Sequence, residues 1–170
     1  RLAKSRGVKW FSSSSLRYAK SLLELKQAGL KGAIVWGPAE MEPHHYLDLS
    51  WYGIHAAEML FTLMGRGCET VTRAYSETQD EVTCRWADGR IGTVRALRGE
   101  YAPFGAVVIP ANNKVMQSGP KFEYSYVPLV REIVKFFETG KPPVDEAETL
   151  EIFAFLDAAQ KSREQGGKPV

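Results

Sequence analysis

The feature that most constrains the fold is a change of hydrophobic period along the chain. From about residue 69 to residue 116, apolar and polar side chains alternate with a period of two, which is typical of half-buried strands. Asp88-Gly89, inside this stretch, is a strong signal for a tight hairpin turn. Tight connections join antiparallel neighbours. The stretch therefore predicts about four or five strands in a mostly antiparallel sheet.

Helical periodicity brackets this alternating stretch on both sides. Apolar residues recur at helical spacing in four segments, and we expect helices over residues 16–28, 50–64, 127–138 and 145–163. Two short strand-like pieces, Val8–Phe11 and Leu30–Trp36, flank the first of these helices. The order predicts an α+β fold: an open, mostly antiparallel sheet with helices packed on one face, preceded by a short βαβ unit.

Composition excludes several classes of partner. The 170 residues are 44% hydrophobic, enough for a sizeable core, and the basic residues behind the net charge of +2 are scattered. We therefore expect no nucleic-acid partner. No apolar run approaches the roughly 18 residues that cross a bilayer, and no signal peptide is visible, so we expect a cytoplasmic protein with no membrane partner.

Cysteine usage argues against a disulfide-dense scaffold. Cys68 and Cys84 are the two cysteines, and they form no C-x-x-C pattern of the kind that binds zinc. The favoured interpretation is a pair of buried or half-buried free thiols, with a single disulfide left open as the alternative.

The best candidate for a functional cluster is the junction between a loop and the second expected helix. All three histidines, with Asp48 and Glu58, lie in residues 44–58. A helix that starts near residue 50 places His55 in its second turn, with Glu58 three residues on and Asp48 two turns back on the same side. The positive end of the helix dipole favours a neutral histidine, which donates or accepts a proton near neutral pH. The alternative is a hydrogen-bonded core histidine.

Metal and phosphate sites are weaker interpretations. His44 and His45, with Asp48 or Glu42, are possible ligands, but adjacent histidines rarely point at one ion and no H-x-x-x-H pattern occurs. We therefore expect no metal. Gly65-Arg66-Gly67 follows a helix rather than preceding one, so it predicts a helix stop. No G-x-G-x-x-G follows a strand anywhere in the chain.

Three passages stand in a fixed order that covers nearly the whole chain. They are residues 13–19; residues 48–65, which contain Gly53, His55 and Glu58 in the pattern G-x-H-x-x-[DE]; and residues 127–170, which include Gly140-Lys141-Pro142-Pro143. Together they resemble the C-terminal part of the Gfo/Idh/MocA oxidoreductases (glucose–fructose oxidoreductase, inositol dehydrogenase and rhizopine-catabolism proteins). The first passage resembles the last helix start of that family's Rossmann domain, the second its substrate helix and the third its closing helices.

The resemblance implies a fold and a reaction. It implies an N-terminal Rossmann domain that binds NAD or NADP, and a C-terminal open sheet whose free face packs on a partner subunit. It also implies hydride transfer between the nicotinamide and a hydroxyl-bearing carbon of a sugar, a polyol or a derivative. His55 matches the family's proton-transfer histidine, and Glu58 matches the acid after it. The family's second proton-transfer residue, the lysine of an E-K-P motif, would lie before Arg1.

Two positions depart from the family pattern. Trp51 stands where the family has an aspartate four residues before the histidine, and Asp48 is the nearest acid upstream. Residues 40–43, Glu-Met-Glu-Pro, lie in the wrong region for the E-K-P motif and lack its lysine. The first departure puts the proton relay in question.

These inferences give a division of the chain and a set of roles. We expect residues 1–36 to be a remnant of the C-terminal edge of a Rossmann domain with a linking strand, and residues 37–170 to be a substrate-binding and oligomerisation domain. The chain opens on Arg1 rather than methionine, so we expect truncation or processing, and an inactive piece. His55 is the predicted acid/base and Arg17 the predicted cofactor contact. The predicted substrate-binding residues are Asp48, Trp51, Tyr52, Glu58, His44, His45 and Tyr46.

Two rival functions use the same fold. A carbohydrate-binding sensor without turnover is supported by Trp51. A homo-oligomerisation module would present an apolar sheet face, expected to consist of Val82, Cys84, Trp86, Ile91 and Thr93.

Overall fold

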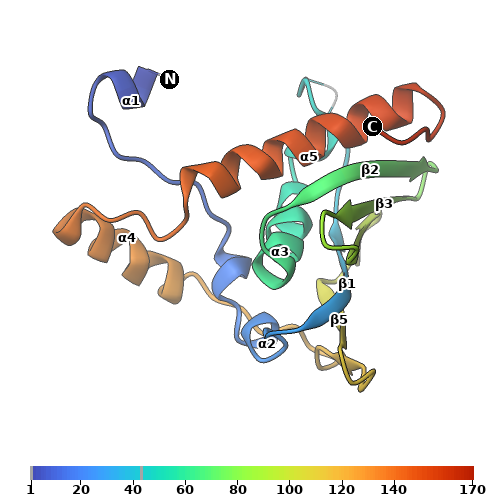
Figure 1. Cartoon of the computed structure of the whole chain (residues 1–170), viewed down its shortest axis with the longest axis horizontal. Helices are drawn as coiled ribbons and strands as arrows, with labels where there is room; N and C mark the ends of the chain where they lie inside the picture. Colours follow the sequence, from blue (N-terminus) through green and yellow to red (C-terminus); the bar gives the residue numbers. More distant parts are fainter. Residues whose placement is uncertain (1, 43) are drawn as a thin grey trace.

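The computed structural model describes residues 2–42 and 44–170 and contains one sheet of six strands in the order β2-β3-β4-β1-β5-β6 (Figure 1). Its strands are β1 (Leu30–Pro38), β2 (Cys68–Tyr75), β3 (Gln79–Trp86), β4 (Ile91–Leu97), β5 (Gly105–Pro110) and β6 (Met116–Gln117). Every neighbouring pair is antiparallel except β1 and β4, which run parallel. The predicted open, mostly antiparallel α+β sheet is confirmed.

Helices cover one face of this sheet. The helical segments are α1 (Leu2–Ser5), α2 (Lys20–Leu23), α3 (Ile54–Met64), α4 (Val127–Thr139) and α5 (Glu146–Glu164), with the short 3₁₀ turns η1 (Ser15–Tyr18) and η2 (Asp48–Ser50). Helix α3 packs on β1 and β4, and α5 packs on β2 and on α3. All residues of α3 from Ala56 to Met64 are buried. The start of α3 is therefore fixed by the core beneath it.

The strand pattern gives the sheet two different faces. Val82 pairs with Val94 and both are buried, whereas the neighbouring pair Thr83 and Thr93 points to the open face. This register corrects one expectation. Val82, Cys84 and Trp86 lie on the helix-covered face, while Ile91 and Thr93 lie on the open one. The five residues do not form one apolar surface, because the sequence period alone does not say which faces of two strands coincide.

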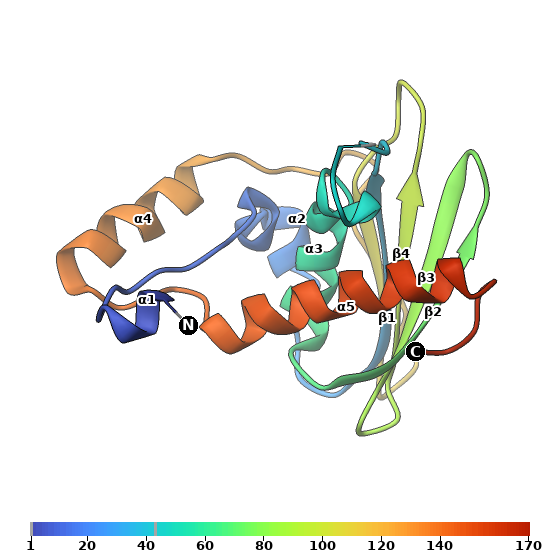
Figure 2. The same ribbon diagram turned by 90° about the horizontal axis from the view of Figure 1, so that it is seen from above.

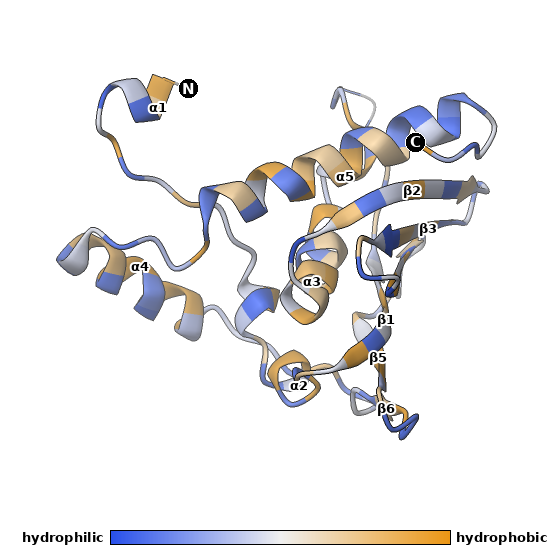
Figure 3. Cartoon of the chain, in the orientation of Figure 1, coloured by the Kyte–Doolittle hydropathy of each residue, from blue (hydrophilic) through white to orange (hydrophobic). Residues whose placement is uncertain are grey.

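Two segments stand away from the sheet. Helix α4 and helix α1 lie away from the sheet, beyond α3 and toward the N-terminal end of α5 (Figure 2), and neither contains a buried residue. Yet α4 carries several apolar side chains, visible as orange bands in Figure 3. Val127, Val130, Val134 and Phe137 recur at helical spacing and are exposed. The sequence predicts an apolar helical pattern over residues 127–138, and nothing among the described residues covers these four exposed side chains.

Several predicted boundaries are wrong. Val8–Phe11 forms no strand, so the expected βαβ unit is incomplete. The first helix is divided into η1 and α2 because Ala19 between them is extended (φ −64°, ψ 130°). The predicted domain boundary at residue 36 falls inside β1, which is a central strand of the sheet. The predicted alternating stretch ends at about residue 116, where β6 has only the two residues Met116–Gln117.

The cysteines form a disulfide rather than the free thiols that we expected. Cys68 and Cys84 lie on the neighbouring strands β2 and β3, and their Cα atoms are 6.1 Å apart. A register shift between Cys68 and Thr70 places Cys68 close to Cys84 across the ladder. The Cα separation is within the usual range for a disulfide.

Candidate functional site

His55 lies in the first turn of α3, one turn nearer the helix start than the sequence predicts, because α3 begins at Ile54. Its ring is half-buried, and Nδ1 lies 2.9 Å from the hydroxyl Oγ of Ser14. Ser14 is the N-cap of η1, a segment of the chain 41 residues upstream. Within the described residues, Nε2 of His55 has no hydrogen-bond partner.

Aromatic rings surround the imidazole. Tyr52 and Phe104 meet the His55 ring edge-on, with ring centroids 5.0 Å and 6.4 Å away. Phe104 in turn packs on Phe122 and Tyr124. Tyr52 and Tyr124 remain exposed. The arrangement gives the polar ring of His55 apolar walls.

Behind His55, Glu58 anchors the site by a buried ion pair. The i, i+3 spacing places His55 and Glu58 on one face of α3, and both face the segment that contains Ser14 and η1. Nε and one terminal nitrogen of Arg17 donate to Glu58 Oε2 at 2.9 and 2.7 Å. The other terminal nitrogen lies 2.6 Å from the carboxylate of Glu148 on α5. Arg17 thus joins α3, η1 and α5 at one point.

The protonation states follow from this packing. Burial lowers the pKa of His55, so the neutral ring dominates at neutral pH. Burial works against the charged form of Arg17, but the charges of Glu58 and Glu148 raise its pKa above the ordinary value. Burial raises the pKa of Glu58, while the charge of Arg17 opposes the rise. The neutral ring of His55 can donate or accept a hydrogen bond, whereas the carboxylate of Glu58 is engaged by Arg17.

Asp48 belongs to a different network. Both of its oxygens accept hydrogen bonds from Arg73, at 2.7 and 2.9 Å, and Arg163 of α5 donates to it at 2.5 Å. Arg73 also binds the buried Asp80, which a second arginine, Arg98, contacts as well. Burial opposes ionisation of Asp48, but the hydrogen bonds and charges of Arg73 and Arg163 hold its pKa below the ordinary value.

The expectation that Asp48 lies two turns back on the same side of the helix as His55 is therefore not met. Asp48 lies in η2, outside α3, so the spacing rule that would bring the two side chains together does not apply. Its carboxylate instead ties the loop before α3 to β2 and α5. We interpret it as a structural residue.

The other predicted contacts lie on the loop before α3. His44, His45 and Tyr46 are exposed, Tyr46 to 89%. The exposed Trp51 packs against His45, with ring centroids 5.2 Å apart, and His44 binds Glu42. In the described part of the chain, no three His, Cys, Asp or Glu side chains gather closely enough to hold a metal ion. The structure brings Tyr52, His55 and Glu58 together and leaves the loop residues apart.

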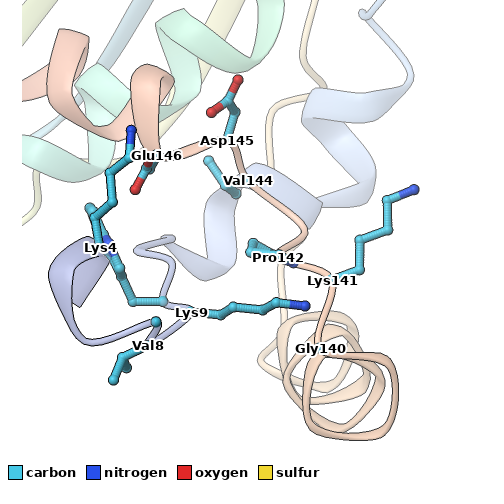
Figure 4. A pocket seen from close by; sticks show the side chains of 11 residues that line it. Lys4, Val8, Lys9, Gly140, Lys141, Pro142, Val144, Asp145 and Glu146 are labelled. Atoms are coloured by element: carbon cyan, nitrogen blue, oxygen red, sulfur yellow. The ribbon is translucent and has the colours of Figure 1, made fainter.

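An open cavity of about 640 Å³ lies elsewhere, between the N-terminal segment and the turn from α4 to α5 (Figure 4). Lys4, Lys9 and Lys141 line it, together with Val8 and Pro142. None of the residues around His55 contributes to its wall. The cavity is therefore not part of the His55 site.

Two residues of the site were missed by sequence reasoning. Ser14 lies in the serine run Ser12–Ser15, and Phe104 lies in a loop without a pattern. The serine run carried a usable signal, because an N-cap serine presents its Oγ at a helix start. Nothing local says that His55 will be its second partner. The cofactor contact expected of Arg17 stays a prediction, since all three of its guanidinium nitrogens contact Glu58 or Glu148.

Solved structures show where else this fold occurs. The chain matches GenD2 from gentamicin A biosynthesis, crystallised in complex with NAD, at 17% identity and a TM-score of 0.74; the match covers 99% of this chain and 65% of GenD2. It matches scyllo-inositol dehydrogenase from Lactobacillus casei, bound to NAD(H) and scyllo-inositol, at 11% identity and a TM-score of 0.77; the match covers 99% of this chain and 66% of that enzyme. A probable dehydrogenase from Thermotoga maritima matches at 17% identity and a TM-score of 0.76, over 98% of this chain and 66% of that protein.

These matches show a shared fold. The chain spans about two thirds of the length of the dehydrogenases that it matches. No protein-family model matches the sequence, and no curated protein does. In the described residues, no helix is both long and apolar enough to cross a membrane.

Proposed function

We propose that this chain is the substrate-side part of an NAD(P)-dependent oxidoreductase that acts on a sugar, a polyol or a derivative. The observation that carries the proposal is the half-buried His55, whose Nε2 is unpartnered among the described residues and which is walled by aromatic rings. It stands in a fold shared with dehydrogenases solved with NAD. Nε2 of His55 forms a hydrogen bond with the oxygen of the reacting carbon. Tyr52 and Phe104 hold the carbon skeleton against it.

The cofactor belongs to a part outside this chain. A nicotinamide supplies or accepts the hydride, but the described residues form no glycine-rich turn between a strand and a helix, and Arg17 is engaged by two carboxylates. The exposed apolar stripe of α4 supports the proposal of a separate cofactor-binding part, because an exposed apolar patch often marks a surface that binds another domain or protein. We assign that contact to the cofactor-binding part, and we expect this chain alone to be inactive.

Association with a second copy is the other contact that we propose. The open face of the sheet carries Ile34, Trp36, Val107 and Ile109 on the neighbouring strands β1 and β5. These four apolar residues could pack against the same residues of a second copy of the chain. We expect a homo-oligomer through it, measurable by light scattering after size exclusion, with Ile34→Glu shifting the chain toward the monomer.

A non-catalytic sensor is the second candidate function. It is favoured by Trp51 and by the placement of Asp48, which together leave His55 without a carboxylate partner among the described residues. A sensor needs only the aromatic walls and a hydrogen-bonding edge, both of which are present.

The direct test uses the chain as it is. Binding of a polyol and sugar panel is followed by NMR shifts of the His55 and Tyr52 side chains, and binding of NADH by its fluorescence. We expect millimolar binding of at least one polyol at His55 and no NADH binding. His45→Ala, on the exposed loop, is the matched control that keeps the polyol shifts, whereas His55→Ala loses them. Tight NADH binding by the chain, or no shift with any compound, would contradict the proposal.

A further inference from the structure

The Ser14 hydroxyl lies between two polar neighbours but has a single proton to donate. Its Oγ accepts the backbone N–H of Leu16 at 3.2 Å, as an N-cap does, and lies 2.9 Å from Nδ1 of His55. Ser14 is buried at 7% exposure. Among the described residues, His55 is the one acceptor within reach of this hydroxyl proton.

Two arrangements of the protons fit this distance, and they are not equivalent. If Ser14 donates to Nδ1, both the Ser14 hydroxyl and Nδ1 of His55 have a partner, and the neutral ring carries its proton on Nε2. If Nδ1–H donates to Ser14, Oγ accepts twice and its own buried proton has no acceptor in the described structure. A buried donor without a partner is costly, so the first arrangement is favoured by about tenfold or more.

We infer that Ser14 is a positioning residue that holds neutral His55 in the Nε2–H form. In that form, His55 presents a hydrogen-bond donor to the substrate oxygen rather than a lone pair. This role deepens, and rests on, the proposed function at the same site. A neutral imidazole that donates can polarise a carbonyl oxygen and stabilise the negative charge that develops on it.

The inference assigns the proton differently from the resemblance. When a hydroxyl is oxidised, its C–H bond breaks with the hydride passing to NAD(P)⁺, and its O–H bond breaks with loss of a proton. His55 with a proton already on Nε2 does not take that proton. The base is then a group of the amine class on the proposed cofactor-binding part. This division agrees with Trp51, which stands where the resemblance expects an acid.

Substitution of Ser14 by an acceptor reverses the prediction. A carboxylate at position 14 still caps η1, because aspartate is a good N-cap. It accepts but does not donate, so it draws the ring proton to Nδ1 and leaves a lone pair on Nε2. Ser14→Thr retains the hydroxyl and is the conservative rescue. Ser14→Ala removes the partner altogether.

The test is a long-range ¹H–¹⁵N correlation spectrum of the ¹⁵N-labelled chain, read at His55 at a pH where the ring is neutral. We expect the Nε2–H pattern in the wild type and in Ser14→Thr, a mixture in Ser14→Ala, and the Nδ1–H pattern in Ser14→Asp. His45, on the exposed loop, serves as the internal reference in every spectrum. Each variant is first checked for native folding by its amide spectrum.

Two results would overturn the inference. One is an Nδ1–H ring in the wild type, which needs no variant to fold. The other is an Nε2–H ring that is equally dominant in Ser14→Ala and Ser14→Asp. The readout involves neither cofactor nor turnover, so it separates this inference from the proposed function. A chain with the expected tautomers whose parent protein turns over no polyol would reject only the function.

Discussion

Two regions of this molecule use similar apolar residues to different effect. The body, defined as the six strands with α3 and α5, buries its large side chains, and Trp86 is 1% exposed. The arm, defined as residues 2–11 with α4, buries none within its helices, and Phe137 is 80% exposed. Both regions have clear apolar periodicity in the sequence. Periodicity thus identifies the face of an element that will be covered, but it does not identify what covers it.

The largest contrast is expected from truncating one aromatic residue in each region. Trp86 packs on Phe61, with ring centroids 5.8 Å apart, and its indole N–H donates to the Gly65 carbonyl at 3.1 Å. Trp86→Ala should lower the free energy of unfolding by about 3–5 kcal/mol through the lost burial and the cavity. Phe137→Ala in the arm should change it by less than about 0.5 kcal/mol. Urea unfolding measures both free energies. Equal losses from Trp86→Ala and Phe137→Ala would contradict the distinction between a buried body and an exposed arm.

The next effect tests whether the arginine–aspartate network belongs to the body. Asp48→Asn should lower the free energy of unfolding by about 3 kcal/mol at pH 7, because it leaves the buried Arg73 poorly paired. The pKa of Asp48 is lowered in the folded protein, so its contribution is complete above the ordinary value of about 3.9 and is lost as pH falls through the folded value. The difference in free energy of unfolding between Asp48→Asn and the wild type should therefore become smaller as the pH falls below about 3.9.

Asp157→Asn is the matched control for this prediction. Asp157 pairs with Lys161 at i, i+4 on the exposed surface of α5, where such pairs contribute about 0.3–0.5 kcal/mol. Urea titrations at pH 7, 5, 4 and 3 measure the free energy of unfolding of both variants and of the wild type. A difference between Asp48→Asn and the wild type that stays constant down to pH 3 would show that the arginines do not lower the pKa of the Asp48 carboxylate.

The disulfide is expected to contribute a comparable amount. Cys68 and Cys84 are 16 residues apart in sequence, and closing a loop of this length stabilises a protein by about 3 kcal/mol. Reduction should lower the free energy of unfolding by that amount without unfolding the body at 25 °C. Thiol titration in denaturant, with and without reductant, measures the bond itself. Two free thiols in the unreduced protein would restore our first expectation and agree with a cytoplasmic location.

The smallest expected effect is that of a polar substitution on the exposed face of α4 in the arm. Val134→Ser on α4 should change the free energy of unfolding by less than about 0.5 kcal/mol, since the side chain is already half exposed. The same change at Val94, which is buried at 2% exposure in β4, should cost at least about 2 kcal/mol. A large loss from Val134→Ser would mean that α4 is part of the body.

The sequence predicts those features that depend on near neighbours. The strand period, the hairpin at Asp88-Gly89 and the stripe of α4 each follow from residues a few positions apart, and each is present. The parallel pairing of β1 with β4 joins residues about 60 positions apart, and no local pattern specifies it. For the same reason, the helix-spacing rule links His55 to Glu58 correctly and fails for Asp48, which lies outside the helix. Ser14 reaches His55 only through the tertiary fold.

The central proposal, that His55 acts on a polyol substrate within a longer oxidoreductase, is tested most directly by turnover of that proposed longer protein. NAD(P)-dependent oxidation of the polyol panel is measured for the wild type, His55→Asn and His45→Asn. We expect kcat for His55→Asn to fall about 100-fold with the cofactor Kd unchanged, and kcat for His45→Asn to stay at the wild-type value. Equal kcat for the wild type and His55→Asn would contradict the account, and binding without turnover in all three proteins would identify a sensor.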